Sequence, residues 1–223
     1  VRASGRVLEV GMGSGLNIPW YDQKVTHLFG LEPSAVLQAE AAELAAAAST
    51  PFPVEFLTAG AESIPLERSS MDCVVSTWTL CSIPDLDLAL AEIRRVLKPG
   101  GALVASVPRY WPERICWALS DAYHANEGGH IRIFRAARLN RDIEALGFRR
   151  YRRHWAHALH APFWWLKCLL WERQHESRLV ALYHRLLVWD LMQRPRLTRW
   201  LESLLNPVLG KSVVMYFHKA PVP

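Results

Sequence analysis

Three glycines at alternate positions constrain the fold of this chain more than any other feature. They end the run Val7-Leu8-Glu9-Val10-Gly11-Met12-Gly13-Ser14-Gly15. The apolar residues before them predict a buried parallel strand over residues 6–10. Glycine readily adopts positive φ and lets a ligand approach the backbone closely. We therefore expect a tight turn that opens a helix, with backbone N–H groups that face a polar ligand.

A second acidic residue supports a nucleoside-binding unit. Glu32 follows 21 residues after Gly11, at the end of the largely apolar run Thr26–Leu31. Strand, turn, helix, strand and acid is the order of a βαβ unit in which the acid accepts hydrogen bonds from ribose hydroxyls. A dinucleotide fingerprint would need its third glycine at position 16, which is Leu16. An NAD-dependent oxidoreductase is therefore disfavoured.

Charge divides the chain into two parts of different character. Residues 1–107 carry 7 Lys and Arg against 12 Asp and Glu, a balance of −5. Residues 108–223 carry 19 against 9, a balance of +10, and hold eight of the nine histidines. A length of 223 residues suits one α/β domain with an insertion. We expect a cofactor domain in the first part and a basic, aromatic cap in the second.

Hydrophobic periodicity and turn residues predict the elements along the chain. Strands are expected over residues 6–10, 26–31, 54–58, 71–77, 102–107, 148–155 and 212–217. Helices are expected over residues 16–21, 35–48, 86–97, 113–123, 138–146, 179–192 and 197–205. Ser34 and Asp85 are the predicted N-caps of two of these helices.

The first part resembles a known enzyme class along its whole length. Its Glu-x-Gly-x-Gly-x-Gly pattern is similar to motif I of the class I S-adenosylmethionine-dependent methyltransferases, of the methyltransferase domain 11 type. Asp72–Val75 before a loop and Arg95–Gly101 before a strand extend the resemblance. It implies an α/β, Rossmann-like sheet of seven strands, mostly parallel, with strand seven antiparallel. It also implies S-adenosyl-L-methionine as cofactor and methyl transfer as the reaction.

Two finer resemblances point to different relatives. The loop Ser76–Pro84 makes residues 1–107 look like the alkyl-thiol methyltransferase-like branch. Residues 108–223 look more like uncharacterised actinobacterial methyltransferases. Helices that usually precede the first strand in this class are not seen before residue 6. A truncated or a recombined chain is therefore left open.

The segment between the last two expected strands predicts an insertion. In the class that the chain resembles, these strands normally form a hairpin, whereas about 55 residues separate them here. Apolar residues at helical spacing in this segment predict a helical insertion between strands six and seven. We expect a cofactor-binding methyltransferase domain of residues 1–156 and 211–223, and a helical cap of residues 157–210.

The resemblance assigns cofactor contacts to ten residues. Glu9 would hold the amino group of S-adenosylmethionine, and Glu32 would accept hydrogen bonds from both ribose hydroxyls. The others would line the methionine part, the adenine and the sulfonium: Gly11, Gly13, Gly15, Gly60, Ala61, Glu62, Thr77 and Trp78. Gly60 stands where the class often has Asp, so Glu62 or the main chain would meet the adenine. Glu62 is equally compatible with a solvated surface acid.

Catalysis by such a site needs few protein groups. Methyl transfer from a sulfonium is an in-line displacement, to which a protein mainly supplies alignment and desolvation. A base is needed only when the acceptor is protonated. Candidate bases follow the fifth strand, namely Tyr123, His124, Glu127 and His130. His124 is the first choice because imidazole titrates near neutral pH, although each candidate alone also fits a structural role.

Metal binding is not expected. His154, His157 and His160 recur at spacing three, but no carboxylate or cysteine at ligand spacing completes a site. The cysteines, Cys73, Cys81, Cys116 and Cys168, are scattered and are expected to be free thiols in a reducing compartment. No signal peptide is seen, and a cytoplasmic protein is expected.

An apolar run has two interpretations, which imply different kinds of acceptor. Residues Ala161–Trp171 are too few to span a bilayer. They are either cap core or an interfacial segment for a lipid-like acceptor, in which case Arg149–Arg153 would suit anionic headgroups of a membrane that the protein binds peripherally. Nucleic acid is disfavoured because no RNA-binding module is evident. The oligomeric state is left open.

These observations predict a methyltransferase that acts on a small or lipophilic acceptor. Two alternatives are kept. One is a non-catalytic cofactor-binding or scaffold protein of the same fold, and the other is a peripheral-membrane, lipid-modifying methyltransferase.

Overall fold

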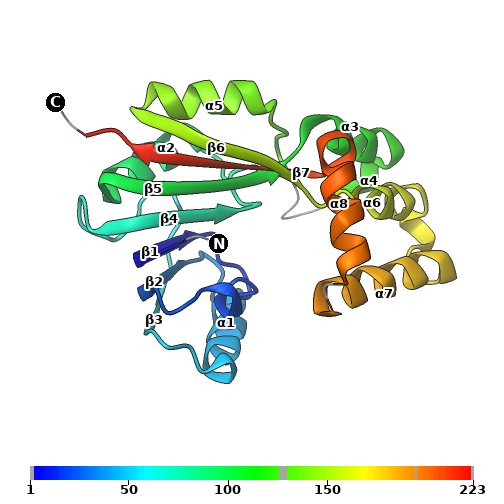
Figure 1. Ribbon diagram of the computed structural model, residues 1–223, viewed down its shortest axis with the longest axis horizontal. Helices are drawn as coiled ribbons and strands as arrows, with labels where there is room; N and C mark the ends of the chain where they lie inside the picture. Colours follow the sequence, from blue (N-terminus) through cyan, green and yellow to red (C-terminus); the bar gives the residue numbers. More distant parts are fainter. Residues whose placement is uncertain (1–2, 126–129, 194, 222–223) are drawn as a thin grey trace. The chain divides into compact units, whose positions relative to one another are not determined.

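The elements of the protein alternate between strands and helices at first and become mainly helical between β6 and β7 (Figure 1). The computed structural model describes residues 3–125, 130–193 and 195–221. The elements, with η for a 3-10 helix, are β1 (Gly5–Val10), η1 (Ile18–Trp20), β2 (Val25–Leu31), α1 (Ala35–Ala48), β3 (Val54–Leu57), β4 (Met71–Thr77), α2 (Leu86–Val96), β5 (Leu97–Pro108), α3 (Tyr110–Leu119), α4 (Asp121–His124), α5 (Ala136–Ala145), β6 (Phe148–Ala156), α6 (His160–Leu169), η2 (Trp171–Arg173), α7 (Arg178–Gln193), α8 (Arg196–Leu209) and β7 (Ser212–Lys219).

The strands form one sheet of seven in the order β3-β2-β1-β4-β5-β7-β6. β1 pairs in parallel with β2 and β4, β2 with β3, and β4 with β5. β7 runs antiparallel to β5 (Figure 1). Val7, Leu8 and Val10 of β1 are buried, as a central parallel strand covered on both faces requires. The predicted Rossmann-like fold, with strand seven antiparallel, is confirmed.

The chain forms two compact units. The first consists of Val1–Ser106, Leu139–Arg152 and Met215–Pro223, and the second of Val107–Arg138 and Arg153–Val214. The predicted helical insertion between strands six and seven is present as α6, η2, α7 and α8. The second unit takes in the predicted cap, residues 157–210, and also residues 107–138.

Local sequence signals place two helices of the first unit correctly. α1 has the predicted bounds, and the Ser34 Oγ accepts a hydrogen bond from the Leu37 N–H at 3.4 Å. α2 begins after Asp85, whose Oδ1 accepts a hydrogen bond from the Leu88 N–H at 3.0 Å. Both side chains satisfy N–H groups that the first turn of a helix leaves without a partner.

Two predicted helices differ from the structure. Residues 16–21 form only the short 3-10 helix η1, in which Pro19 provides no N–H, so the glycine turn does not open an α-helix. The helix expected over residues 113–123 is divided into α3 and α4 at Ser120. The Ser120 Oγ accepts a hydrogen bond from the Tyr123 N–H at 3.0 Å and so starts a new helix instead of continuing the old one.

The apolar run of residues 161–171 belongs mainly to the core of the second unit. It forms most of α6, where Phe163 packs with Val180 and Leu187 of α7. The Trp165 Nε1 donates a hydrogen bond to the Pro112 carbonyl at 3.0 Å. Of the two interpretations of this run, the structure therefore supports cap core.

The basic run of residues 149–153 lies on β6, the last strand in the order of the sheet. Its four arginines are exposed. Charged side chains on an edge strand hinder pairing with the strand of another molecule, which gives this run a structural explanation. Among the described residues, no helix has the length and apolar content that crossing a bilayer requires.

The packing of Trp165 yields a first prediction. Trp165→Ala removes the contact with the Trp111 ring, 5.6 Å between centroids, and the hydrogen bond to Pro112. We expect it to lower the free energy of unfolding by about 3 kcal/mol. Trp165→Phe keeps most of the packing and should cost about 1 kcal/mol. Urea titrations followed by circular dichroism measure both, and an alanine variant as stable as the wild type would contradict the core assignment.

Candidate functional site

The predicted cofactor residues gather at the carboxyl ends of neighbouring strands in the first unit. β1 lies between β2 and β4, and the chain reaches β4 only after passing through β2 and β3. Strand order therefore reverses beside β1, and open α/β sheets bind ligands in the crevice outside such a reversal. Glu9, Glu32 and Thr77 stand at the ends of β1, β2 and β4.

The glycine turn has the backbone that the sequence predicts. The φ angles of Gly11, Gly13 and Gly15 are 68°, 57° and 80°. A Cβ would collide with the Thr79 side chain at Gly11 and would crowd Ala41 at Gly15. At Gly13 it would meet no described atom within 4 Å. The backbone at Gly13 therefore borders open space, where a ligand can approach it.

Glu32 ties the glycine turn to the end of β2. Its Oε2 accepts a hydrogen bond from the Gly13 N–H at 2.9 Å, and its Oε1 accepts one from the Ser34 N–H at 3.1 Å. The side chain is largely buried, with 8% of the residue exposed. Each carboxylate oxygen keeps a further lone pair, so the same group can still accept hydrogen bonds from ligand hydroxyls.

Glu9 is buried and accepts hydrogen bonds from two residues that were not singled out in the sequence. The Asn17 Nδ2 donates to its Oε1 at 2.7 Å, and the Tyr21 hydroxyl donates to its Oε2 at 2.9 Å. Asn17 also donates to the Thr77 Oγ1 at 3.2 Å, which links the ends of β1 and β4. Burial raises the pKa of Glu9 to about 7, although both hydrogen bonds oppose this rise. Glu9 therefore anchors the segment that follows the glycine turn.

The other predicted contacts lie on two loops of the first unit. Gly60 and the buried Ala61 precede Glu62, whose Oε1 accepts a hydrogen bond from the Asp85 N–H at 3.3 Å, beside the start of α2. Trp78 follows β4 with a φ of 59°, donates its N–H to a backbone carbonyl, and leaves 37% of the residue exposed. Glu62 thus has a local structural role, and Trp78 offers an apolar ring at the strand end.

Two of the four candidate bases, Tyr123 and His130, meet at a buried acid of the second unit. The Tyr123 hydroxyl donates a hydrogen bond to the Glu113 Oε1 at 2.6 Å, and the His130 Nε2 lies 3.8 Å from the same oxygen. The Lys211 Nζ donates to the Glu113 Oε2 at 2.6 Å. Burial raises the pKa of Tyr123 and holds the pKa of His130 below its ordinary value. Glu113 and Lys211 were not singled out in the sequence because nothing in their spacing pairs them.

His124 has a different environment. Its ring stacks on the Trp117 ring at 4.0 Å between centroids, and the side chain is exposed. His124 is therefore accessible to a solute, whereas Tyr123 is partly buried. Glu127 lies outside the described residues.

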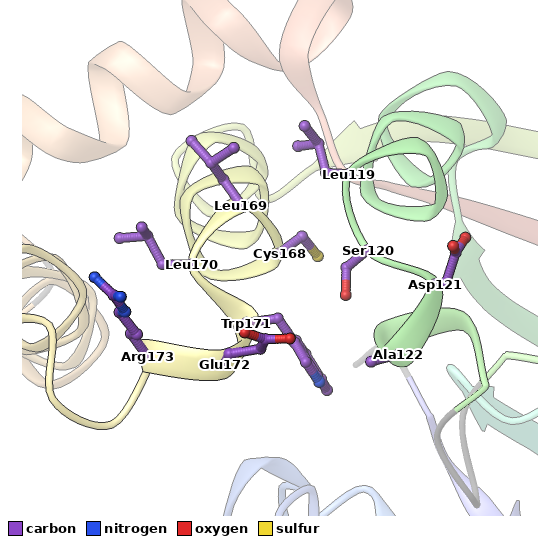
Figure 2. Close-up of a pocket in the computed structure, with 10 residues that line it drawn as sticks. All are labelled: Leu119, Ser120, Asp121, Ala122, Cys168, Leu169, Leu170, Trp171, Glu172 and Arg173. Atoms are coloured by element: carbon purple, nitrogen blue, oxygen red, sulfur yellow. The ribbon is translucent and has the colours of Figure 1, made fainter.

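A pocket of about 640 Å³ lies within the second unit. It is formed by residues 119–122, at the junction of α3 and α4, and by residues 168–173, at the end of α6 and in η2. In Figure 2, Ser120 and Cys168 face each other across the space, with Trp171 along one wall. Both apolar and charged side chains line it, which suits a ligand of mixed polarity.

The histidines at spacing three do not form a metal site among the described residues, where no group of metal-binding side chains is found. The His157 and His160 rings lie 5.3 Å apart, and the His157 Nδ1 lies 3.2 Å from the Ser212 Oγ. Burial and the neighbouring cationic groups lower the pKa of His157 to about 4. Cys73, Cys81, Cys116 and Cys168 are buried thiols that are not in disulfides.

The sequence matches known proteins mainly over the first unit. Residues 8–105 match the family model described as methyltransferase domain. A ubiquinone/menaquinone biosynthesis C-methyltransferase from Hahella chejuensis is 45% identical over 51 residues, 23% of this chain and 20% of that protein. The protein of the same name from Campylobacter jejuni is 31% identical over 102 residues, 45% of this chain and 39% of that protein. The chain thus covers less than half the length of these relatives.

Solved structures with the same fold match nearly the whole chain. YcgJ from Bacillus subtilis superimposes with a TM-score of 0.64 at 16% identity, over 99% of this chain and 94% of that chain. An S-adenosylmethionine-dependent methyltransferase from Thermotoga maritima gives 0.63 at 20% identity, over 98% and 83%. The cyclase SpnF gives 0.63 at 20% identity, over 99% and 78%. Such likeness shows the fold, and the cyclase shows that this fold carries other chemistry too.

The match to the methyltransferase-domain family model implies S-adenosylmethionine as the cofactor. The residues of the first unit fit it. Gly13 borders open space, where the cofactor could approach the backbone closely. The Glu32 carboxylate accepts a hydrogen bond from the Gly13 N–H and so lies next to this turn. The finer resemblances to the alkyl-thiol and actinobacterial branches stay predictions.

The raised pKa of Glu9 predicts a pH dependence of stability. The folded protein holds this proton up to about pH 7, whereas an unfolded chain releases it near pH 4.5. The folded state therefore binds more protons in this window, and its stability should fall as pH rises through it. Relative to Glu9→Gln, the wild type should lose about 2.5 kcal/mol between pH 5 and pH 8.

Urea titrations at several pH values measure this difference. Glu43→Gln, on the exposed face of α1, is the matched control and should follow the wild-type profile. Parallel profiles for the wild type and Glu9→Gln would show that Glu9 ionises normally in the folded protein.

Proposed function

We propose that this protein, whose residues 8–105 match the methyltransferase-domain family model, transfers a methyl group from S-adenosylmethionine to a small or lipophilic acceptor. One observation carries the proposal. At the reversal of strand order, the glycine turn borders open space at Gly13, and Glu32 holds that turn by its carboxylate. This is the arrangement that a nucleoside with free ribose hydroxyls requires.

The first unit would bind and orient the cofactor, which supplies a methyl group already activated on a sulfonium sulfur. Gly11, Gly13 and Gly15 would bring backbone to its methionine part, and Glu32 would accept hydrogen bonds from the ribose. Glu9, which accepts hydrogen bonds from Asn17 and Tyr21, would hold the segment after the turn in place.

Three further groups complete the proposed cofactor site. Residues 60–62 would border the adenine. Thr77 and Trp78 would line the sulfonium, because the face of an indole ring attracts a cation.

The protein's contribution to the reaction would be alignment and exclusion of water. In-line displacement requires the acceptor and the methyl group within roughly 3–3.5 Å, and such positioning provides much of the acceleration. No covalent intermediate with the protein is needed.

The second unit would bind the acceptor. Its pocket has a volume of about 640 Å³, within the range of roughly 300–1,000 Å³ typical of small-molecule sites. The apolar side chains of Leu119, Leu169, Leu170 and Trp171 favour a lipophilic part of the acceptor. The names of the bacterial relatives, which refer to quinone biosynthesis, support an apolar acceptor as well.

A general base would be His124. Tyr123 and His130 are engaged with Glu113, and burial disfavours their charged forms, whereas His124 is exposed. This role is confined to acceptors that carry a proton at the working pH.

The affinity for the cofactor product, measured with and without the Glu32 carboxylate, tests the proposal. Calorimetric titration of the wild type with S-adenosylhomocysteine should show binding, and titration with NAD should not. Glu32→Ala should weaken that binding by about 1.5–3 kcal/mol, because it removes charge-assisted hydrogen bonds. Glu43→Ala, an exposed acid on α1, is the control and should bind like the wild type. Binding of NAD alone would contradict the assignment of the cofactor.

Methyl transfer itself tests the base. With an S-adenosylmethionine carrying a labelled methyl group, His124→Ala should lower turnover on a protonated acceptor while the affinity for S-adenosylhomocysteine is unchanged. The loss should shrink for an acceptor that is already ionised. His175→Ala, another exposed histidine, is the control. Cofactor binding without label transfer to any acceptor would instead indicate a non-catalytic protein.

A further inference from the structure

Helix α7 has two apolar sides. One faces the core of the second unit through Val180 and Leu187, which pack with Phe163. The other consists of Leu179, Leu182, Leu186 and Trp189, each between 48% and 66% exposed. Their spacing of three, four and three residues places them along one side of the helix. The core of the unit therefore uses only part of the apolar surface of α7.

Helix α8 also carries an exposed apolar stripe. Thr198 is buried, whereas Leu197, Trp200, Leu204 and Val208 are each between 60% and 67% exposed. Their spacing of three, four and four residues again makes a stripe along one side. Together with exposed Val188, Leu191 and Met192, α7 and α8 hold eleven of the 21 large hydrophobic side chains that are exposed among the described residues. Scattered exposed apolar residues need no explanation, but two stripes on consecutive helices do.

The exposed charges of α7 and α8 have one sign. The exposed ionic side chains of α7 and α8 are all arginines, namely Arg178, Arg185, Arg196 and Arg199. The two acids of these helices, Asp190 and Glu202, are only partly exposed. Helices with Leu and Trp on one side and arginine at their margins are typical of segments that lie in the interface of an anionic bilayer.

We propose that the exposed sides of α7 and α8, called here the α7–α8 surface, dock the protein on an anionic lipid bilayer. The leucines and valines would enter the boundary of the acyl chains, and Trp189 and Trp200 would lie at the level of the headgroups, which indole prefers. The arginines would pair with lipid phosphates while their aliphatic stems cover apolar surface. The helices have 16 and 14 residues, so they would lie on the bilayer and not cross it.

This surface differs from the one that the sequence suggested. The apolar run of residues 161–171 is mainly core, and the arginines of residues 149–153 occupy an edge strand. The inference does not depend on methyl transfer, because it concerns adsorption alone and is measured without cofactor.

Flotation of the intact protein with vesicles tests the inference. The protein should float with phosphatidylcholine–phosphatidylglycerol vesicles at low salt, float less at high salt, and stay behind with phosphatidylcholine alone. Leu182→Gln with Trp200→Gln should lower the partition coefficient about tenfold or more. Arg196→Gln with Arg199→Gln should lower it by a similar factor and flatten its salt dependence.

Matched controls separate this surface from others. Val36→Gln, an equally exposed apolar residue of α1, and Arg149→Gln with Arg150→Gln on β6 should partition like the wild type. Because the substituted side chains are exposed, the melting temperature of the Leu182→Gln, Trp200→Gln variant should also stay at the wild-type value.

Several outcomes would overturn the inference. A protein that stays behind with both kinds of vesicle does not dock on lipid through any surface. A fall in melting temperature with unchanged partition would show that the rest of the chain covers the stripes. Light scattering measures the oligomeric state of the wild type and of the Leu182→Gln, Trp200→Gln variant. If the wild type is a dimer, the variant is a monomer and the partition coefficient is unchanged, the surface binds a second copy of the chain and not a bilayer.

Discussion

The hydrogen bond from the Gly13 N–H to the Glu32 carboxylate is the contact on which the proposed site depends. It joins the turn after β1 to the end of β2, two segments that the parallel pairing of these strands brings together. Because the carboxylate fixes the turn, the glycine φ angles are held positive and the open side of Gly13 keeps its direction. Glu32 therefore both stabilises the turn and can bind the ligand. Both roles require an acid at the end of β2, beside the turn.

The second unit is organised around another buried acid. Glu113 is fully buried and meets Lys211 and Tyr123, so its charge is balanced by one cation and its oxygens accept two strong hydrogen bonds. Removing one partner from such a pair leaves a buried charge without compensation, which is strongly destabilising. This network therefore explains why Tyr123 is a poor candidate for a base and leaves His124 as the accessible one.

Most strands and the helices α1 and α2 could be predicted from the sequence, because their signals are local: apolar runs and the N-cap residues Ser34 and Asp85. β5 begins at Leu97, before the predicted start at residue 102. The glycine turn was also predictable, since few residues adopt its φ angles. The roles of Asn17 and Tyr21 were not, because their hydrogen bonds to Glu9 depend on how the chain returns after the turn. The Glu113–Lys211 pair spans 98 positions, and no spacing rule reveals it.

The most direct test of the central claim is hydrogen–deuterium exchange of the intact protein with and without S-adenosylhomocysteine. We predict slower exchange in peptides that contain Gly11–Asn17 and in those that contain residues 59–63, with residues 178–209 unchanged. Protection confined to the pocket of residues 119–122 and 168–173, or protection by NAD and not by S-adenosylhomocysteine, would contradict a cofactor site at the glycine turn.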